Sequence, residues 1–115
     1  ADYSLMNLGS LVTIANQSPP NLTLIVLDNE SYSSTGGQLS YTAGKTSLAE
    51  IARATGIENV LEVRSVEELK RALSESKGKT SVIVAKVEKG NVNVPVIPLS
   101  PYRIKKRFMK AAKNS

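Results

Sequence analysis

The chain has 115 residues, 41% of them hydrophobic and 22% charged, and it contains no cysteine, histidine or tryptophan. This length suits a single domain with its own core. The composition excludes disulfides, thiolate or imidazole metal sites, and Ser-His or Cys-His nucleophile pairs. Any catalysis must come from carboxylates, lysines, a hard metal or a borrowed cofactor.

The positive charge is concentrated at the end of the chain. Residues 101–115 hold six basic and no acidic residues, whereas the first hundred hold nine basic and ten acidic ones. A basic tail can bind nucleic acid, but only Tyr102 and Phe108 accompany the bases here. We therefore favour a solvated helix face, and keep as the alternative a non-catalytic module that binds nucleic acid or an acidic partner.

No apolar run approaches twenty residues, and no basic-then-apolar leader precedes one. We expect a cytoplasmic protein without membrane contact.

The first elements in chain order are a helix, a strand and a long polar segment. Apolar residues at helical spacing predict a helix over 5–15 that ends before Pro19 and Pro20. The continuous apolar run over 22–27 predicts a strand buried on both faces, in the interior of a parallel sheet. The polar, glycine-bearing residues 29–46 predict a loop. Eighteen residues is long for a structureless connection in a compact domain, and such loops are usually functional or mobile.

Two helices and two strands follow. The patterns Ser47-x-x-Glu50 and Ser65-x-x-Glu68 are capping boxes, which predict helices that end near Gly56 and Gly78. Strands are predicted over 60–63 and 81–87. Ser100 and Pro101 begin a last helix as N-cap and first-turn proline, and Ile104, Phe108 and Ala111 or Ala112 form its expected buried side.

This order of elements predicts an α/β fold of three layers, with a mostly parallel sheet flanked by helices. Because such a sheet normally begins with a strand, we expect that the first strand or strands are missing and that the chain is cut at its N-terminus. Residues 1–90 form the expected α/β domain, and residues 91–115 an extended segment plus a basic helix packed on it.

Candidate site residues follow from the sheet topology. Ligands of open α/β sheets bind at the carboxyl ends of the strands, where Asn29 follows a strand, and at helix N-termini, where Asp2 lies. A carboxylate, an amide oxygen and a backbone carbonyl make an oxygen-only set, which Mg²⁺ prefers. The ordinary alternatives are a helix N-cap for Asp2 and a turn residue for Asn29.

Residues 4–15, 21–32, 34–38 (STGGQ) and 98–109 together resemble the diphosphate-binding domain of thiamine-diphosphate-dependent enzymes, most of all the sulfopyruvate and phosphonopyruvate decarboxylases. The resemblance implies the thiamine-diphosphate-binding fold, with thiamine diphosphate and Mg²⁺ as cofactors. It implies three metal ligands: Asp2, the Asn29 side chain and the Ser31 backbone carbonyl. The residues it places at the cofactor are Ser4, Leu5, Asn29, Ser31, Tyr32, Gly36 and Gly37.

Two positions depart from the family pattern. Ala1-Asp2-Tyr3 stands where the family has Gly-Asp-Gly, and a gapless alignment from Leu5 places the motif aspartate on Ala1 instead of Asp2. Asp28 replaces the first asparagine of the Asn-Asn pair, where its side chain can hold the loop through backbone hydrogen bonds.

The resemblance also implies half an active site. The family's catalytic glutamate belongs to a pyrimidine-binding domain, so no catalytic residue is expected on this chain. We expect a decarboxylase subunit or fragment, inactive alone, that another subunit or domain completes in a homo- or hetero-oligomer.

Overall fold

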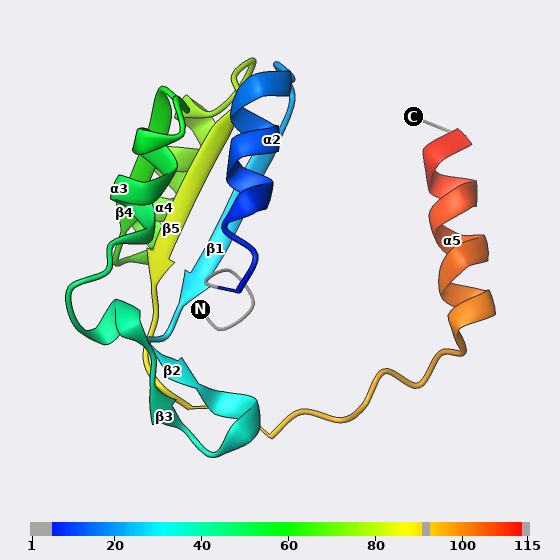
Figure 1. Cartoon of the computed structure of the whole chain (residues 1–115). Helices are drawn as coiled ribbons and strands as arrows, with labels where there is room; N and C mark the ends of the chain where they lie inside the picture. Colours follow the sequence, from blue (N-terminus) through cyan, green and yellow to red (C-terminus); the bar gives the residue numbers. More distant parts are fainter. Residues whose placement is uncertain (1–5, 91–92, 114–115) are drawn as a thin grey trace.

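A computed structural model describes residues 6–90 and 93–113 (Figure 1). Its first part is a small α/β unit in which strands β1 (Thr23–Asp28), β4 (Asn59–Val63) and β5 (Ser81–Lys86) form a parallel sheet in the order β1-β5-β4. The register pairs Thr23 with Ser81 and Asp28 with Lys86, so β1 and β5 end side by side. The predicted parallel sheet is confirmed.

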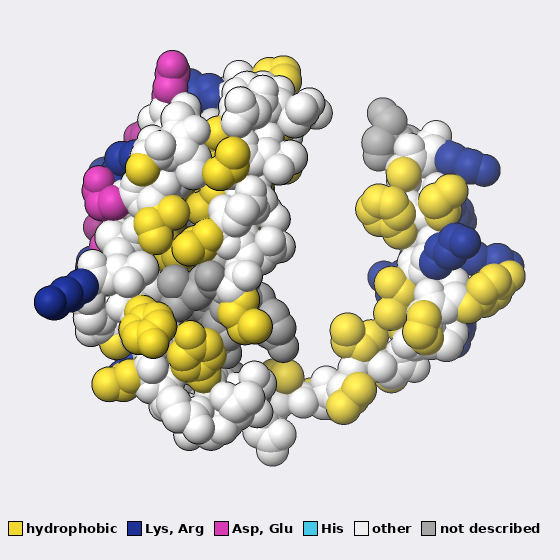
Figure 2. Space-filling model, viewed as in Figure 1, with side chains coloured by type: hydrophobic (Ala, Val, Ile, Leu, Met, Phe, Trp, Pro, Cys, Tyr) yellow, Lys and Arg dark blue, Asp and Glu magenta, His cyan; other side chains and the backbone are white. Residues whose placement is uncertain are grey.

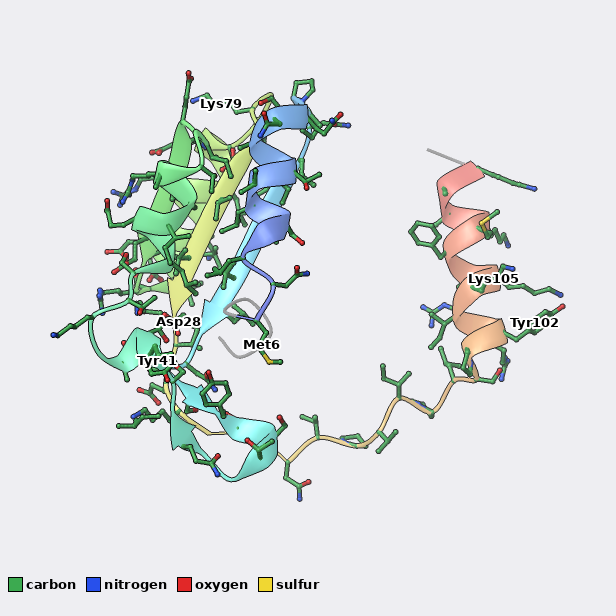
Figure 3. All side chains as sticks on the ribbon, viewed as in Figure 1. Met6, Asp28, Tyr41, Lys79, Tyr102 and Lys105 are labelled. Atoms are coloured by element: carbon green, nitrogen blue, oxygen red, sulfur yellow. The ribbon has the colours of Figure 1, made fainter. Side chains whose placement is uncertain are left out.

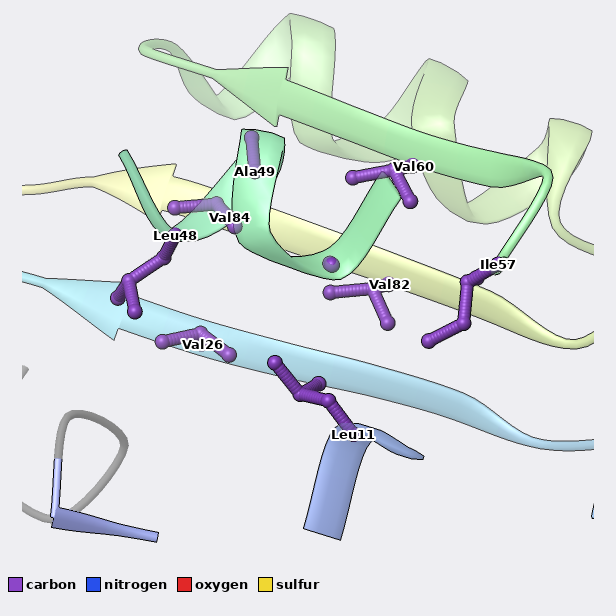
Figure 4. Packing of buried hydrophobic residues seen from close by; sticks show 9 residues of the cluster. Leu11, Val26, Leu48, Ala49, Ile57, Val60, Val82 and Val84 are labelled. Carbon is purple, nitrogen blue, oxygen red and sulfur yellow. The ribbon is translucent and has the colours of Figure 1, made fainter. Parts of the chain in front are cut away.

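Helices cover the two faces of the sheet. On one face, α2 (Gly9–Gln17) and α3 (Leu48–Ala54) pack against the sheet. Figure 4 shows this core, whose buried residues are Leu11, Val26, Leu48, Ala49, Ala52, Ile57, Val60, Val82 and Val84. On the other face, Ala72 of α4 (Val66–Glu75) packs with Val63, Ile83 and Ala85. These helices and the sheet make the three layers that the sequence predicts.

Both predicted capping boxes are confirmed at their N-caps. The Ser47 hydroxyl accepts a hydrogen bond from the Glu50 N–H, and the Ser65 hydroxyl accepts one from the Glu68 N–H, both at 3.2 Å. Each bond satisfies a backbone donor that the first turn of a helix leaves without a partner.

The predicted interior position of the first strand is wrong for the part of the chain that the structure describes. β5 is the central strand, and five of its six residues are buried. β1 lies beside β5 at the end of this sheet, with Ile25 41% and Leu27 60% exposed. Both lie on the α4 face, where α4 contacts β4 and β5. The apolar run correctly indicates a strand here. The position of that strand within the sheet depends instead on which other strands it pairs with.

Residues 29–46, which the sequence predicts as a long loop, contain regular structure. They contain a small antiparallel pair, β2 (Ser31–Tyr32) with β3 (Gln38–Leu39), and two short 3-10 helices, η1 (Ser33–Thr35) and η2 (Tyr41–Ala43). This β2–β3 hairpin lies directly after the carboxyl end of β1 (Figure 1).

The last helix, α5 (Pro101–Lys113), forms as predicted, and its Arg103 N–H donates to the Ser100 hydroxyl at 3.4 Å. It stands apart from the sheet (Figure 1). Its expected buried side is exposed, including Ile104 at 43% and Phe108 at 70%. The packing of α5 on the domain, and the division of the chain at residue 90, stay predictions.

Candidate functional site

The carboxyl ends of β1 and β5 bring one acidic and one basic side chain together. Asp28 and Lys86 are the last residues of their strands and pair in register. The Lys86 ammonium lies 2.7 Å from Oδ2 of Asp28 and 3.2 Å from Oε1 of Glu30. The Asp28 side chain is completely buried, and Lys86 is 15% exposed. This Asp28–Lys86–Glu30 network marks the edge at which α/β sheets bind ligands.

Three donors surround the Asp28 carboxylate. Besides Lys86, Oδ1 accepts hydrogen bonds from the Thr42 hydroxyl at 2.7 Å and from the Glu30 N–H at 3.1 Å. The Ser40 hydroxyl in turn lies 2.8 Å from that of Thr42. The expectation that Asp28 holds the loop through a backbone hydrogen bond is confirmed, and Thr42 extends this hold to η2.

These contacts shift both pKa values of the ion pair. Burial alone would raise the pKa of Asp28, but the hydrogen bonds from Lys86, Thr42 and the Glu30 N–H outweigh burial and lower it below its ordinary value. Burial would likewise lower the pKa of Lys86, and the two carboxylates raise it instead. Both groups are therefore charged at neutral pH.

Asn29 and Ser31, the two predicted ligands that the structure describes, lie next to this network. Oδ1 of Asn29 accepts a long hydrogen bond of 3.3 Å from the Ser31 N–H. Its Nδ2 donates to the Ser33 hydroxyl at 2.7 Å, and that hydroxyl lies 3.2 Å from the Ser31 hydroxyl. Asn29 is half-buried and Ser31 is buried. Asn29 therefore has the local geometry of a turn residue, which is the ordinary alternative to a metal ligand at this position.

The residue between them has an unusual backbone. Glu30 has φ 55°, in the left-handed region that non-glycine residues seldom adopt. Two backbone bonds hold the chain here, because the Ser40 N–H donates to the Glu30 carbonyl and the Val87 N–H donates to the Asp28 carbonyl, both at 3.0 Å. The Asn29–Ser31 turn is thus held by a second segment and by the residue that follows β5.

The remaining described cofactor residues lie in the β2–β3 hairpin. Tyr32 ends β2, and its carbonyl accepts the Gly37 N–H at 2.9 Å, which closes the turn. Gly36 and Gly37 have φ values of 122° and 79°, which residues with a Cβ atom seldom adopt. The structure thus brings Asn29, Ser31, Tyr32, Gly36 and Gly37 into one local unit. The other predicted site residues, Asp2, Ser4 and Leu5, lie outside the described residues.

Sequence reasoning missed Lys86 and Thr42. Lys86 was hidden because its role depends on the register between β1 and β5, and it lies 58 residues from Asp28. The sequence did offer one signal for Lys86, namely a basic residue at the end of a strand that is otherwise apolar and buried. Thr42 offered none, since its contact depends on the fold of residues 29–46.

No helix among residues 6–90 and 93–113 is long and apolar enough to span a membrane.

Comparisons with known proteins give the chain relatives over most of its length. Residues 2–87 match the protein family described as "Thiamine pyrophosphate enzyme, C-terminal TPP binding domain". The chain is 43% identical over 115 residues to the sulfopyruvate decarboxylase subunit beta of Methanocaldococcus jannaschii. It is 44% identical over 113 residues to the protein of the same name from Methanococcus maripaludis. Each match covers 96% of this chain and 60% of the relative.

A more distant relative is the phosphonopyruvate decarboxylase of Streptomyces hygroscopicus, which is 39% identical over 71 residues. That match covers 62% of this chain and 18% of the relative. The chain thus spans about three fifths of the length of the two sulfopyruvate decarboxylase subunits that it matches, and a smaller share of this third protein.

Proposed function

The chain belongs to the thiamine pyrophosphate enzymes, as a C-terminal TPP-binding domain, and we propose that it is the cofactor-binding part of a 2-oxoacid decarboxylase. Sulfopyruvate is the substrate favoured by the relatives that match 96% of the chain, and phosphonopyruvate is the second choice. The observation that carries the proposal is the position of Asn29 and Ser31 at the carboxyl ends of the parallel strands.

The donor atoms at this edge suit a hard cation. An amide oxygen has two lone pairs, and Oδ1 of Asn29 uses one for a long bond to the Ser31 N–H. Asp28 is already engaged by Lys86, Thr42 and the Glu30 N–H. Among residues 6–90 and 93–113, no group of three acidic residues could hold a metal by itself. A mixed set of side-chain and backbone oxygens therefore fits Mg²⁺ best.

We propose the following roles at the cofactor. Mg²⁺ would be held by the side chain of Asn29, the backbone carbonyl of Ser31 and Asp2, and it would offset the charge of the diphosphate. Tyr32, Gly36 and Gly37 line the cofactor from the hairpin, and Ser4 and Leu5 do so from the start of the chain. Bound thiamine diphosphate supplies the nucleophilic carbon and the electron sink for decarboxylation. The contribution of the chain is to fix the diphosphate and balance its charge.

The partner in this proposal is a pyrimidine-binding domain or subunit that provides the catalytic glutamate, in a homo- or hetero-oligomer. The relatives named "subunit beta" support a partner. So do exposed apolar side chains at the site's end of the molecule, namely Met6 (80%), Leu39 (65%) and Tyr41 (78%). Figure 3 shows Met6 and Tyr41 at the same end of the sheet as Asp28. Exposed apolar groups that gather in this way often mark a protein interface.

The test is decarboxylation by the reconstituted pair. The chain, its pyrimidine-binding partner, thiamine diphosphate and Mg²⁺ should release CO₂ from sulfopyruvate or phosphonopyruvate, and neither protein should do so alone. Asn29→Ala should reduce the rate by about 100-fold, since about 1 Å of cofactor displacement costs that much. Asn21→Ala, at an exposed residue before β1, is the matched control. A complex that binds both cofactors but leaves both substrates unreacted would contradict the assignment.

A further inference from the structure

Lys86 holds both residues that flank Asn29. Its ammonium contacts Asp28 at 2.7 Å on one side of Asn29 and Glu30 at 3.2 Å on the other. Because Asp28 is fully buried, no water can replace Lys86 at its carboxylate, whereas the Glu30 side chain is 38% exposed on a residue with a left-handed backbone. A lysine 57 positions further along the chain thus contacts both neighbours of Asn29.

The same contact sets the charge at the edge of the sheet. Two carboxylates stand next to the residues that we propose for Mg²⁺ and the diphosphate. Lys86 compensates one of these two charges and occupies oxygen atoms from both groups. Without it, the carboxylates would repel the anionic diphosphate and would also be available to a cation.

We propose that Lys86 is a positioning residue that keeps Asp28 and Glu30 away from the cation, so that Asn29 and Ser31 present their oxygens to it instead. This inference rests on the proposed function, because it assumes that the Asn29–Ser31 turn holds the metal and diphosphate of the cofactor. It assigns Lys86 no contact with the substrate.

The experiment compares the full chain with Lys86→Met, which keeps most of the side chain's length and removes its charge. Two titrations are made: Mn²⁺ alone, followed by its electron paramagnetic resonance signal, and thiamine diphosphate in excess Mg²⁺, followed by calorimetry. We expect Lys86→Met to bind Mn²⁺ alone more tightly and thiamine diphosphate at least about tenfold more weakly. Lys86→Arg should resemble the wild type in both titrations.

Two variants control for a general loss of structure. Lys79→Met removes an exposed lysine at the opposite end of the sheet and should change neither titration (Figure 3). The double variant Asp28→Asn/Lys86→Met removes the ion pair as a unit, while the amide oxygen that replaces the carboxylate can still accept from Thr42. The double variant retains the net charge of the network. We therefore expect it to bind Mn²⁺ as the wild type does, and to bind thiamine diphosphate with an affinity within about threefold of the wild type.

A cofactor-free measurement adds a third readout. Amide hydrogen exchange at Ser31 and Ser40 should be faster in Lys86→Met than in the wild type, because these N–H groups donate to Asn29 and Glu30. Exchange at Ser81, at the start of β5, should change much less, since that residue lies at the far end of the strand.

The outcomes separate the two proposals. If Lys86→Met binds Mn²⁺ like the wild type, or if the double variant does not recover thiamine diphosphate binding, the role of Lys86 is refuted. If Lys86→Met does not fold, thiamine diphosphate binding by the double variant decides the role of Lys86. Affinity within about threefold of the wild type supports the proposal, and weaker binding refutes it. If the wild-type chain binds no thiamine diphosphate at all, the proposed function fails, and the Mn²⁺ and exchange measurements still decide what Lys86 does.

Discussion

Asp28 is a buried carboxylate that its neighbours keep charged. Burial of a charge is costly unless donors replace the lost water, and here Lys86, Thr42 and the Glu30 N–H do so. The chain thus carries a charge at the end of β1 and a lysine that compensates it. The arrangement joins β1, β5 and η2 at one point.

This carboxylate predicts how stability depends on pH. Because folding lowers the pKa of Asp28, the charged carboxylate contributes stability that is full above its ordinary pKa of about 3.8 and is lost as the pH falls towards its folded value. We expect the difference in unfolding free energy between the wild type and Asp28→Asn to shrink below pH 4, by at most about 1.4 kcal/mol per pH unit. Urea denaturation at pH 7, 4, 3 and 2 measures this difference, and a gap that stays constant with pH would refute the prediction.

At the scale of elements, the helices were the most predictable part. The serine-glutamate spacing located the starts of α3 and α4, because a capping hydrogen bond is local and visible in the sequence. The three strands of the parallel sheet were located to within about a residue or two, but their order was not, and β2 and β3 were missed. Nothing in residues 22–27 distinguishes the strand at the end of a sheet from a central one, and β5 took the central position. The partners of Asp28 stayed hidden for the same reason.

Helix α5 exposes both basic and apolar side chains. Its basic residues and its apolar residues lie on the same exposed helix, as Figure 2 shows. The Lys106 ammonium also lies over the ring of Tyr102, 4.9 Å from its centre. The two residues are four positions apart on the same helix, so this contact needs no other protein or domain. The apolar stripe that contains Ile104 and Phe108 nevertheless predicts that this face of the helix packs against another protein surface.

We expect α5 to pack on the domain in solution, as its periodicity predicts. Phe108→Ser should then lower the unfolding free energy by about 2 kcal/mol and the melting temperature by several degrees, because a buried aromatic side chain becomes polar. Val96→Ser, at a residue that is 91% exposed, is the control and should have little effect. Equal melting temperatures for wild type and Phe108→Ser would show a solvated helix. Salt-sensitive binding of duplex DNA that is lost on deletion of residues 101–115 would instead favour the alternative binding module.

At the scale of the whole molecule, the described candidate site residues gather at one end of the sheet. Its sheet places the Asn29–Ser31 turn, the β2–β3 hairpin and the Asp28–Lys86–Glu30 network at the same end (Figure 1). Exposed apolar residues surround that end, and the chain spans 60% of the length of the subunits that it matches. The absence of histidine and cysteine is consistent with a cofactor that carries the reactive chemistry.

The most direct test of this account is a calorimetric titration of the full chain with thiamine diphosphate in excess Mg²⁺. We predict saturable binding to one site per chain. Binding should be at least about tenfold weaker for Asn29→Ala and unchanged for Asn21→Ala, because in our proposal the Asn29 side-chain oxygen would hold the cation of the cofactor. Equal affinities of wild type and Asn29→Ala would contradict the central claim that this turn binds the cofactor.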